Sequence, residues 1–256
     1  MPIATLISDL GNNDYQIPAV KGALLAANPN LNVVDITHNI KPFHFVDAAY
    51  ILTNCFRDFP DGTFHLIGIE GDFSKKKEWI VAKLENHFFF TKNTGILSII
   101  SDKKPEWCFK IDTAKRDLKF PFKNILAKAA GKMIQGLKPN EIGQPFTDLV
   151  NRSLLQPTVS SYGINGTIVF ITPYENAITN IHRKHFTNFK KFKLCLIHYN
   201  KTEYFDRIFN SYHDLPEGVA GCFFGENGFL ELGIHGGDSK NLLDFIKGKQ
   251  IWIEFK

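Results

Sequence analysis

The chain has 256 residues, of which 44% are hydrophobic and 22% are charged, and its formal net charge is +4. This length can bury a large core, and the composition is that of an ordinary globular protein, not of a disordered, collagen-like or disulfide-rich chain. The small positive charge and the scattered lysines argue against nucleic acid as a partner. No apolar run approaches the roughly 20 residues that cross a bilayer, so we expect no membrane partner.

The cysteines point to a reducing compartment. Four of them lie far apart in the chain and form no Cys-x-x-Cys pair, which disfavours zinc and redox sites and favours buried thiols. The N-terminus enters an apolar strand without the basic and long apolar segments of a signal peptide. We therefore expect a cytoplasmic protein. The cysteines are Cys55, Cys108, Cys195 and Cys222.

In the first half of the chain, apolar strands alternate with helical patterns. The pattern predicts strands at Ile3–Ser8, Leu31–Ile36 and Phe64–Ile69, helices at Gln16–Asn28, Val46–Phe59 and Phe122–Gln135, and a hairpin of Trp79–Leu84 and His87–Phe90. Such alternation is typical of a mostly parallel sheet covered on both sides. We predict an N-terminal α/β domain over residues 1–150.

The character of the sequence changes after residue 135. Residues 136–157 are rich in Pro, Gly and polar side chains, which predicts a linker. Short apolar runs separated by Asn-Gly turns then predict an all-β, barrel-like domain over residues 158–256. Its expected strands are Ile164–Ile171, Lys193–Tyr199, Val219–Phe224, Phe229–Ile234 and Gln250–Glu254, with one late helix near Asn241–Lys247.

Several common sites are not supported by the sequence. The turn after the first strand reads Asp-Leu-Gly-Asn-Asn, which is neither a dinucleotide-binding glycine motif nor a phosphate-binding loop. His182 and His185 are three residues apart, but basic residues separate them and no thiol or carboxylate accompanies them. A solvated basic turn is the better interpretation, and we expect no metal.

Two carboxylates, Asp9 and Asp14, lie in the turn after the first predicted strand. Asp14 precedes the first predicted helix and has the side chain of an N-cap. Asp9 has no such structural role, because it directly follows a buried strand. Side chains at the carboxyl end of an open α/β sheet lie where such sheets bind ligands. The sequence therefore predicts a ligand site at Asp9.

Five stretches together resemble one family, the S-adenosylmethionine (SAM) hydroxide adenosyltransferases, relatives of the fluorinating and chlorinating enzymes. The family's opening pattern is matched by Ser-Asp-Leu-Gly at 8–11, Asp-Tyr at 14–15 and Lys-Gly at 21–22, and the segment Val-Asp-Ile-Thr-His at 34–38 also matches. The remaining stretches are 59–73, 91–98 and 172–181. The resemblance implies an N-terminal α/β domain, a C-terminal β-barrel and a homotrimer whose ligand lies between subunits.

The resemblance also assigns ligand-binding residues. It implies that Asp9 accepts hydrogen bonds from both ribose hydroxyls, and a carboxylate suits that task because it accepts from two donors. It places Asp14 near the methionine ammonium and Phe43 as an aromatic wall beside the ribose. Tyr174 takes the position of an aromatic that stacks on adenine, and Asn176 that of an amide contacting adenine or methionine. Core packing is the alternative role for Phe43 and Tyr174.

The catalytic positions depart from the family pattern. The family holds a water with Asp, Arg and His, and here Glu70 and Lys77 align with the first two. Pro121 stands where the family has His, and Thr172 where it has an Asp near the methionine ammonium. Lys lacks the planar fork of Arg, and Pro carries no proton. We expect structural or solvent roles for the remaining candidate imidazoles, His38 and His44.

Two functions therefore remain open. In the first, the protein hydrolyses SAM to adenosine and methionine, with Glu70 and Lys77 holding the water and no cofactor needed. The leaving methionine is already activated by its sulfonium charge, so the enzyme mainly positions a desolvated nucleophile. In the second, the protein binds SAM or adenosine without catalysis, because fold alone does not fix function. Hydroxide is a better-supported nucleophile than halide, because nothing in the sequence marks a halide pocket.

Overall fold

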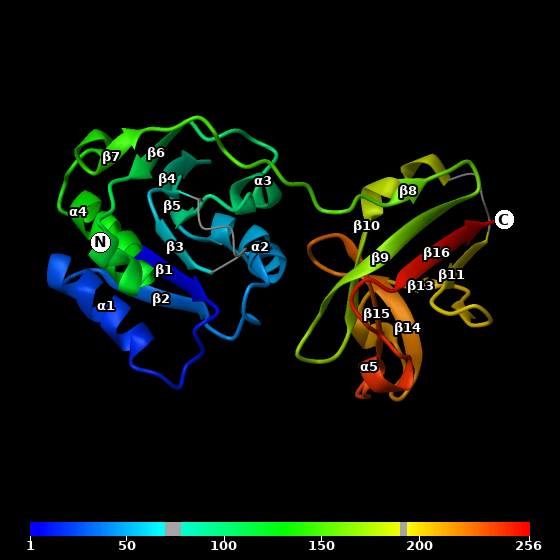
Figure 1. Ribbon diagram of the computed structural model, residues 1–256. Coiled ribbons are helices and arrows are strands. Elements are labelled where there is room, and N and C mark those ends of the chain that lie inside the picture. The colour runs from blue at the N-terminus through cyan, green and yellow to red at the C-terminus, as the bar shows by residue number, and fades with distance from the viewer. Residues whose placement is uncertain (70–77, 190–193) are drawn as a thin grey trace. The chain divides into compact units, whose positions relative to one another are not determined.

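The computed structural model describes residues 1–69, 78–189 and 194–256. It divides into two compact units, Met1–Ser153 and Leu154–Lys256, each with its own hydrophobic core (Figure 1). The predicted catalytic residues Glu70 and Lys77 lie outside the described residues. The two units are described in turn.

The N-terminal unit is built on one mixed sheet with the strand order β2-β1-β3-β5-β4-β6-β7. The first four strands in this order are parallel, and β4, β6 and β7 pair antiparallel. The predicted α/β class is confirmed, and parallel pairing is confined to one half of the sheet. The strands are β1 (Ile3–Ser8), β2 (Asn32–Thr37), β3 (Phe64–Gly68), β4 (Trp79–Leu84), β5 (His87–Lys92), β6 (Trp107–Ile111) and β7 (Gly143–Pro145).

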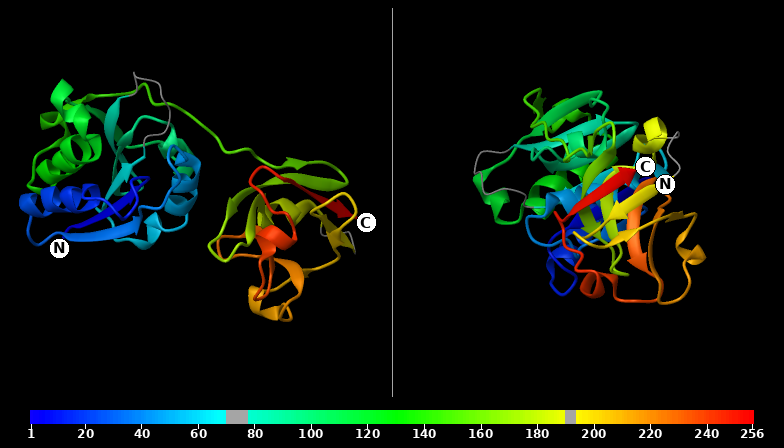
Figure 2. Two further views of the ribbon diagram at one scale, coloured as in Figure 1. Left: turned by 60° about the horizontal axis from the view of Figure 1, so that its bottom comes forward. Right: turned by 90° about the vertical axis from the view of Figure 1, so that its right-hand side faces the viewer.

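Helices cover both faces of this sheet (Figures 1 and 2). On one face lie α1 (Gln16–Ala27), the wide helix η3 (Phe122–Ala127) and α4 (Lys128–Ile134). On the other face lie α2 (Phe45–Thr53) and α3 (Ile96–Ile100), with the short turn η1 (Phe56–Asp58) after α2. The short turn η2 (Lys115–Lys119) precedes η3 and contacts it. Along β1, Leu6 packs into the first core and Ile7 into the second, as strand alternation requires.

The hairpin between β4 and β5 has the turn that its sequence predicts. Glu85 and Asn86 adopt φ values of 49° and 65°, the left-handed pair that matches strand twist in a two-residue hairpin. The Glu85 side chain accepts hydrogen bonds from Arg57, Ser101 and Lys103. This carboxylate therefore connects the hairpin to η1 and to the residues after α3.

The prediction of a linker over residues 136–157 is wrong for most of these residues. Residues 139–141 form the turn η4 (Pro139–Glu141), and residues 143–145 form β7 at the sheet edge. Beyond β7, Asn93 bonds the backbone of Asp148 and Val150, and Ser98 both donates to and accepts from the backbone of Arg152. Pro and Gly mark these residues as irregular, but side-chain hydrogen bonds hold them against the N-terminal unit.

The C-terminal unit is the barrel-like β structure that the turn pattern predicts. Its strand order is β12-β11-β16-β9-β10-β15-β14-β13, and β8 pairs with β9. The late helix is shorter than expected, because α5 ends at Leu242 and Asp244 has a φ of 51°. The remaining elements are β8 (Thr158–Val159), β9 (Gly163–Ile171), β10 (Ala177–His182), η5 (Arg183–Phe189), β11 (Cys195–His198), β12 (Tyr204–Phe205), β13 (Ile208–Phe209), η6 (Tyr212–Asp214), β14 (Ala220–Phe224), β15 (Phe229–Ile234), α5 (Ser239–Leu242) and β16 (Gln250–Phe255).

Two features are absent from the described residues, a membrane-spanning helix and a cluster of metal ligands. None of the helices there is both long and apolar enough to cross a membrane. Nowhere in the same part of the chain do three or more His, Cys, Asp or Glu side chains gather as metal ligands.

Candidate functional site

The candidate site of the N-terminal unit begins at the end of β1, as the sequence predicts. Asp9 follows Ser8, the last residue of the strand, and its side chain is partly buried. The parallel neighbours β2 and β3 end at the same sheet edge, at Thr37 and Gly68. Loops that follow parallel strands at this edge form the ligand crevice of open α/β sheets.

Asp9 and Phe43 are brought together by a hydrogen bond. The backbone N–H of Phe43 donates to Asp9 Oδ2 over 3.0 Å. The Phe43 backbone has a φ of 68°, which is rare for a bulky residue. The residue is 45% exposed. Phe43 therefore lies at the surface beside Asp9 and not in the core.

The predicted N-cap at Asp14 is wrong. The N-cap of α1 is Tyr15, and no side chain caps the helix. Asp14 is exposed, and its Oδ1 accepts a hydrogen bond from the N–H of the next residue, Tyr15. The residues Gly11 to Asp14 form an irregular turn before the helix, so the side chain cannot reach the first helical amides. Its carboxylate remains accessible to a ligand.

A row of polar contacts runs from Ser8, the residue before Asp9, through His38 and Asp35 to Lys21. Ser8 Oγ is 2.7 Å from His38 Nδ1, and His38 Nε2 is 3.2 Å from Asp35 Oδ1, which in turn pairs with Lys21. Ser8 and His38 are buried, whereas Asp35 and Lys21 are about one-third exposed. Burial alone raises the pKa of Asp35, but contact with Lys21 and His38 lowers it below its ordinary value. Asp35 therefore stays ionised.

The helix η3 approaches the end of β3 closely. A Cβ on Gly68 would lie 2.6 Å from the ring of Phe122, so only glycine lets this ring pack there. Pro121 stands just before Phe122 with helical φ and ψ angles, an ordinary position for proline. The position where the resemblance expects a histidine thus carries no group that moves a proton. Wide helical turns such as η3 are frequent at functional sites.

In the C-terminal unit, the predicted residues lie at the turn between β9 and β10. Tyr174 is 82% exposed, and Glu175 has a φ of 64°. Thr172 Oγ1 accepts from the N–H of Asn176, so Thr172 stabilises the turn through its hydroxyl. The exposed ring of Tyr174 is free of core packing and can stack on a flat ligand.

Asn176 is the buried member of this group. Its Oδ1 accepts from Ser239, whose hydroxyl also accepts from the N–H of Ile234. A Cβ on Gly233 would collide with this amide, so the glycine makes room for Asn176. Within the described part of the chain, Nδ2 has no hydrogen-bond partner. The amide therefore presents a donor from a fixed orientation.

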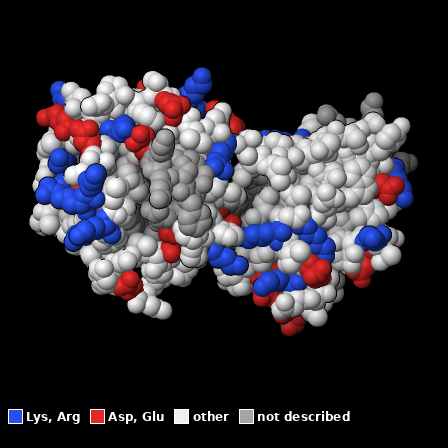
Figure 3. All heavy atoms as spheres, viewed as in Figure 1, with Lys and Arg blue, Asp and Glu red and all other residues white. Residues whose placement is uncertain are grey.

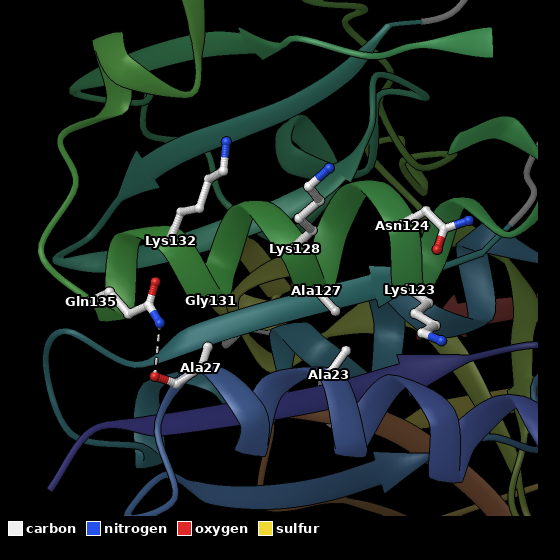
Figure 4. Close-up of a pocket in the computed structure, with 9 residues that line it drawn as sticks. All are labelled: Ala23, Ala27, Lys123, Asn124, Ala127, Lys128, Gly131, Lys132 and Gln135. Carbon is white, nitrogen blue, oxygen red and sulfur yellow. Dashed lines mark hydrogen bonds between the residues drawn. The ribbon is translucent and has the colours of Figure 1, made fainter. Parts of the chain in front are cut away.

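The hollow between α1 and α4 does not have the chemistry of this site. It encloses about 290 Å³ and is floored by small residues, Ala23, Ala27, Ala127 and Gly131. Lys128 and Lys132 extend from α4 away from α1, and Gln135 donates to the carbonyl of Ala27 (Figure 4). Over the two units, basic and acidic side chains are interspersed on the face shown in Figure 3. Neither feature marks an anion site.

A larger hollow of about 770 Å³ lies beside α3 in the N-terminal unit. Its lining includes Ile80, Leu97, Trp107 and Phe146, together with Arg152. None of the predicted ligand-binding residues lines it. These two hollows therefore lie apart from the carboxylate site at Asp9.

The contacts that link Ser8, His38, Asp35 and Lys21 were not predicted from the sequence. All four residues nevertheless fall within the quoted motifs, at 8–11, 21–22 and 34–38. The expected structural role of His38 agrees with its burial, and His44 is half exposed, 3.7 Å from Asp47. The contact of Ser8 with His38 joins residues 30 positions apart, and periodicity carries no signal for it.

Comparisons with known proteins agree with this architecture. Residues 4–143 match the SAM hydroxide adenosyltransferase N-terminal domain, and residues 166–252 match the corresponding C-terminal domain. A crystal structure of an uncharacterised conserved protein from Thermotoga maritima has a TM-score of 0.86 at 21% identity and covers 98% of this chain and 99% of that one. A conserved hypothetical protein from Thermus thermophilus has a TM-score of 0.77 at 21% identity, with both chains fully covered.

Curated relatives carry related names. A protein named (R)-S-adenosyl-L-methionine hydrolase from Methanocaldococcus jannaschii is 23% identical over 245 residues, covering 91% of this chain and 88% of the relative. A fluorinase from Actinoplanes sp. is 23% identical over 215 residues, covering 71% of this chain and 72% of the relative. Because the two domain matches together span most of the chain, this protein belongs to the SAM hydroxide adenosyltransferase family.

Proposed function

We propose that this protein binds SAM and hydrolyses it to adenosine and L-methionine. Water attacks the ribose C5′, the C5′–S bond breaks, and methionine leaves as a neutral thioether while a proton passes to solvent. The observation that carries the proposal is the placement of Asp9, whose carboxylate ends β1 at the ligand edge of an α/β sheet. The relative named as a SAM hydrolase supports the same chemistry.

Each predicted residue has a role in this proposal. Asp9 accepts from the two ribose hydroxyls, and the exposed ring of Phe43 covers one side of the sugar. Asp14 offers a carboxylate to the methionine ammonium. Tyr174 stacks on the adenine, and Asn176 donates its free amide N–H to the ligand. These assignments rest on the family resemblance, and the exposure of Tyr174 and the fixed amide of Asn176 are compatible with them.

Glu70 and Lys77 hold the water in this proposal. The reaction needs no cofactor, because the sulfonium already makes methionine a good leaving group and catalysis is then a matter of positioning. The resemblance further supports a homotrimer with each ligand bound between subunits, and the widely spaced cysteines favour a reducing compartment such as the cytoplasm. Light scattering on the purified protein tests the trimer, and a monomer or dimer would contradict it.

The test is to incubate the purified protein with SAM and follow adenosine and methionine by chromatography. We expect both products in equal amounts, and lower rates for Glu70→Gln and Lys77→Met. Lys75→Met, from the same run of lysines, is the matched control and keeps the wild-type rate. Adding chloride or fluoride separates the nucleophiles, because halide transfer would yield a halogenated nucleoside instead of adenosine. If adenosine and methionine form no faster than in buffer alone, the hydrolase proposal is wrong.

A second candidate function is a non-catalytic binder of SAM or adenosine. It is favoured by Pro121, because proline occupies the position where the resemblance expects a proton-carrying histidine. Calorimetry separates the two candidates. Binding of SAM or adenosine without release of adenosine supports the binder, and binding of neither ligand contradicts both functions.

A further inference from the structure

The position of His38 depends on an irregularity in β2. The parallel register between β1 and β2 shifts between Leu6 and Ile7, so that Leu6 pairs with Asp35 and Ile7 pairs with Thr37. One residue, Ile36, is skipped. Such bulges are rare between parallel strands and often redirect a side chain near a functional site. Here His38 lies two residues after the skipped Ile36, and its imidazole contacts Ser8 at the end of β1.

The His38 segment holds the chain on both sides of Asp9. Before Asp9, the Ser8 hydroxyl contacts His38 Nδ1 over 2.7 Å and also accepts from the N–H of Leu10 over 3.4 Å. After Asp9, the N–H of Gly11 donates to the carbonyl of His38 over 2.8 Å. Residue 9 thus lies between neighbours that are all bonded, directly or through Ser8, to His38.

The far side of the imidazole faces a charge. The ionised Asp35 can only accept, so the proton of the imidazole belongs on Nε2, which faces it. Nδ1 then accepts from the Ser8 hydroxyl, whose oxygen accepts in turn from the N–H of Leu10. Nε2 is buried, lies 3.2 Å from Asp35 Oδ1 and has no well-aligned hydrogen bond in the described residues. Lys21 pairs with the other oxygen of Asp35. The ion pair of Asp35 and Lys21 faces Nε2 and orients the imidazole from that side, as carboxylates orient the histidines that bind metals.

Ser8, His38 and Asp35 have the residue types of a hydrolytic triad, but their placement excludes that role. Ser8 is fully buried, with 0% of its surface exposed, and His38 is 2% exposed. A nucleophilic hydroxyl must touch its substrate, and this one cannot. The contacts of Ser8, His38 and Asp35 therefore stabilise the position of Asp9, the residue after Ser8, and do not involve a ligand.

We propose that Ser8 and His38 are positioning residues that fix the orientation of the Asp9 carboxylate, with Asp35 and Lys21 holding the imidazole. The inference rests on the proposed function, in which Asp9 binds the ribose. Its physical reason is that binding groups work only when a surrounding shell holds them within a fraction of an ångström.

The structure supplies a matched control on the same strand. Thr5 Oγ1 lies 2.7 Å from His65 Nδ1, the same distance and the same pair of atom types as Ser8 and His38. Both hydroxyls belong to buried residues of β1, but Thr5 is four residues from Asp9. Ser8→Ala and Thr5→Val therefore each delete one buried hydroxyl–histidine hydrogen bond, and only the first lies beside the carboxylate.

The experiment measures adenosine affinity by calorimetry and amide hydrogen exchange by NMR, on full-length protein well below every unfolding midpoint. We expect Ser8→Ala and His38→Leu to weaken adenosine binding about tenfold, the scale of one hydrogen bond. We expect Thr5→Val to bind within about twofold of the wild type on the same scale. His38→Asn keeps a polar nitrogen near the Nδ1 position and is expected to restore most of the affinity lost in His38→Leu.

Amide hydrogen exchange shows, without any ligand, whether the residues around Asp9 are held in place. We expect the amides of Gly11 and Phe43, which bond His38 and Asp9, to exchange faster in Ser8→Ala and unchanged in Thr5→Val. Wild-type affinity and exchange in Ser8→Ala, or equal losses in Thr5→Val, overturn the inference while leaving the proposed function intact. If the wild type binds neither adenosine nor SAM, the proposed function fails, and exchange at these two amides alone decides whether Ser8 and His38 hold the turn.

Discussion

The carboxylate of Asp9 and the backbone of Phe43 are joined by a hydrogen bond of 3.0 Å between residues 34 positions apart. This bond holds a non-glycine residue in the left-handed region, where backbone conformations cost of order 1 kcal/mol or more. One oxygen of Asp9 is thereby used to place Phe43. The carboxylate and the aromatic wall of the proposed ribose site are consequently set by one interaction.

Substitutions at Asp9 separate its two roles. Asp9→Asn keeps an oxygen that accepts from Phe43, but it loses the charge that strengthens bonds to ribose hydroxyls. We expect adenosine affinity to fall about 10- to 100-fold with little change in the thermal midpoint. Asp9→Ala also removes the acceptor for Phe43, so its midpoint should fall as well. Calorimetry and thermal unfolding check both, and wild-type affinity in Asp9→Asn would exclude ribose binding by this residue.

The exposed tyrosine of the C-terminal unit can be tested against a matched partner. Tyr174 is 82% exposed and Tyr162 is 72% exposed, so neither substitution by Ala should change stability by more than about 0.5 kcal/mol. Stacking on a base contributes about 1–3 kcal/mol. Tyr174→Ala should therefore weaken adenosine binding at least several-fold, whereas Tyr162→Ala should not. Equal affinities of the two variants would show that Tyr174 does not stack on the ligand.

The buried histidine pair predicts sensitivity to mild acid. His65 and His87 lie 3.2 Å apart between β3 and β5, and burial, together with the neighbouring His87, lowers the pKa of His65 to about 3. An unfolded histidine takes up a proton near pH 6.5, so the unfolded state binds more protons below that pH and stability falls as pH falls. His65 alone should remove about 2 kcal/mol by pH 5.

Denaturant unfolding between pH 7 and pH 5 measures this effect. His65→Asn keeps a polar atom for Thr5 but cannot titrate, and its stability should depend less steeply on pH than that of the wild type. Parallel pH profiles of the two proteins would mean that His65 does not titrate on unfolding.

Glu85 should contribute stability in a lower pH range. The hydrogen bond from Arg57, helped by Ser101 and Lys103, lowers the pKa of Glu85 from 4.5 to about 2. Its contribution is present above pH 4.5 and is lost as the pH falls from there toward 2. At pH 7, Glu85→Gln should destabilise the protein by about 1–2 kcal/mol, because it weakens several charge-assisted bonds at once.

The control for Glu85 is Glu106→Gln. Glu106 is about half exposed and, among the residues that the structure describes, pairs with Lys83 alone, so its loss should cost less than about 0.5 kcal/mol. Urea unfolding of both variants gives the comparison. A loss in Glu85→Gln no larger than that in Glu106→Gln would mean that the cluster around Glu85 adds nothing beyond a surface pair.

The parts of the fold that the sequence predicted correctly are those set by residues close together in the chain. The Glu85-Asn86 turn and the strand β1 follow from residue types that act within a few positions. The strand β10 was not predicted, because the polar Thr179 and Asn180 interrupt its apolar pattern. Both are buried and satisfied by distant partners, the carbonyls of Leu230 and Leu155. A polar residue in a core is explained only once its partner is known.

The candidate site divides in the same way. The position of Asp9 directly after β1 was predictable, because the apolar run Ile3–Ser8 is a local signal for a buried strand. Its bond to Phe43 and the support from His38 depend on contacts over some 30 residues, which neither periodicity nor turn chemistry encodes. The N-cap at Asp14 was wrong because residue preference at helix starts does not fix the path of the preceding turn.

The hydrogen bonds of Asn93 and Ser98 to the backbone of residues 148–152 decide where the protein can be divided for separate study. A fragment cut at residue 150 discards Arg152, the backbone partner of Ser98, and with it the outermost tie of that segment. A fragment of residues 1–153 keeps every one of these bonds. This fragment contains the whole N-terminal unit, so it is the one on which to test whether that unit folds without the barrel.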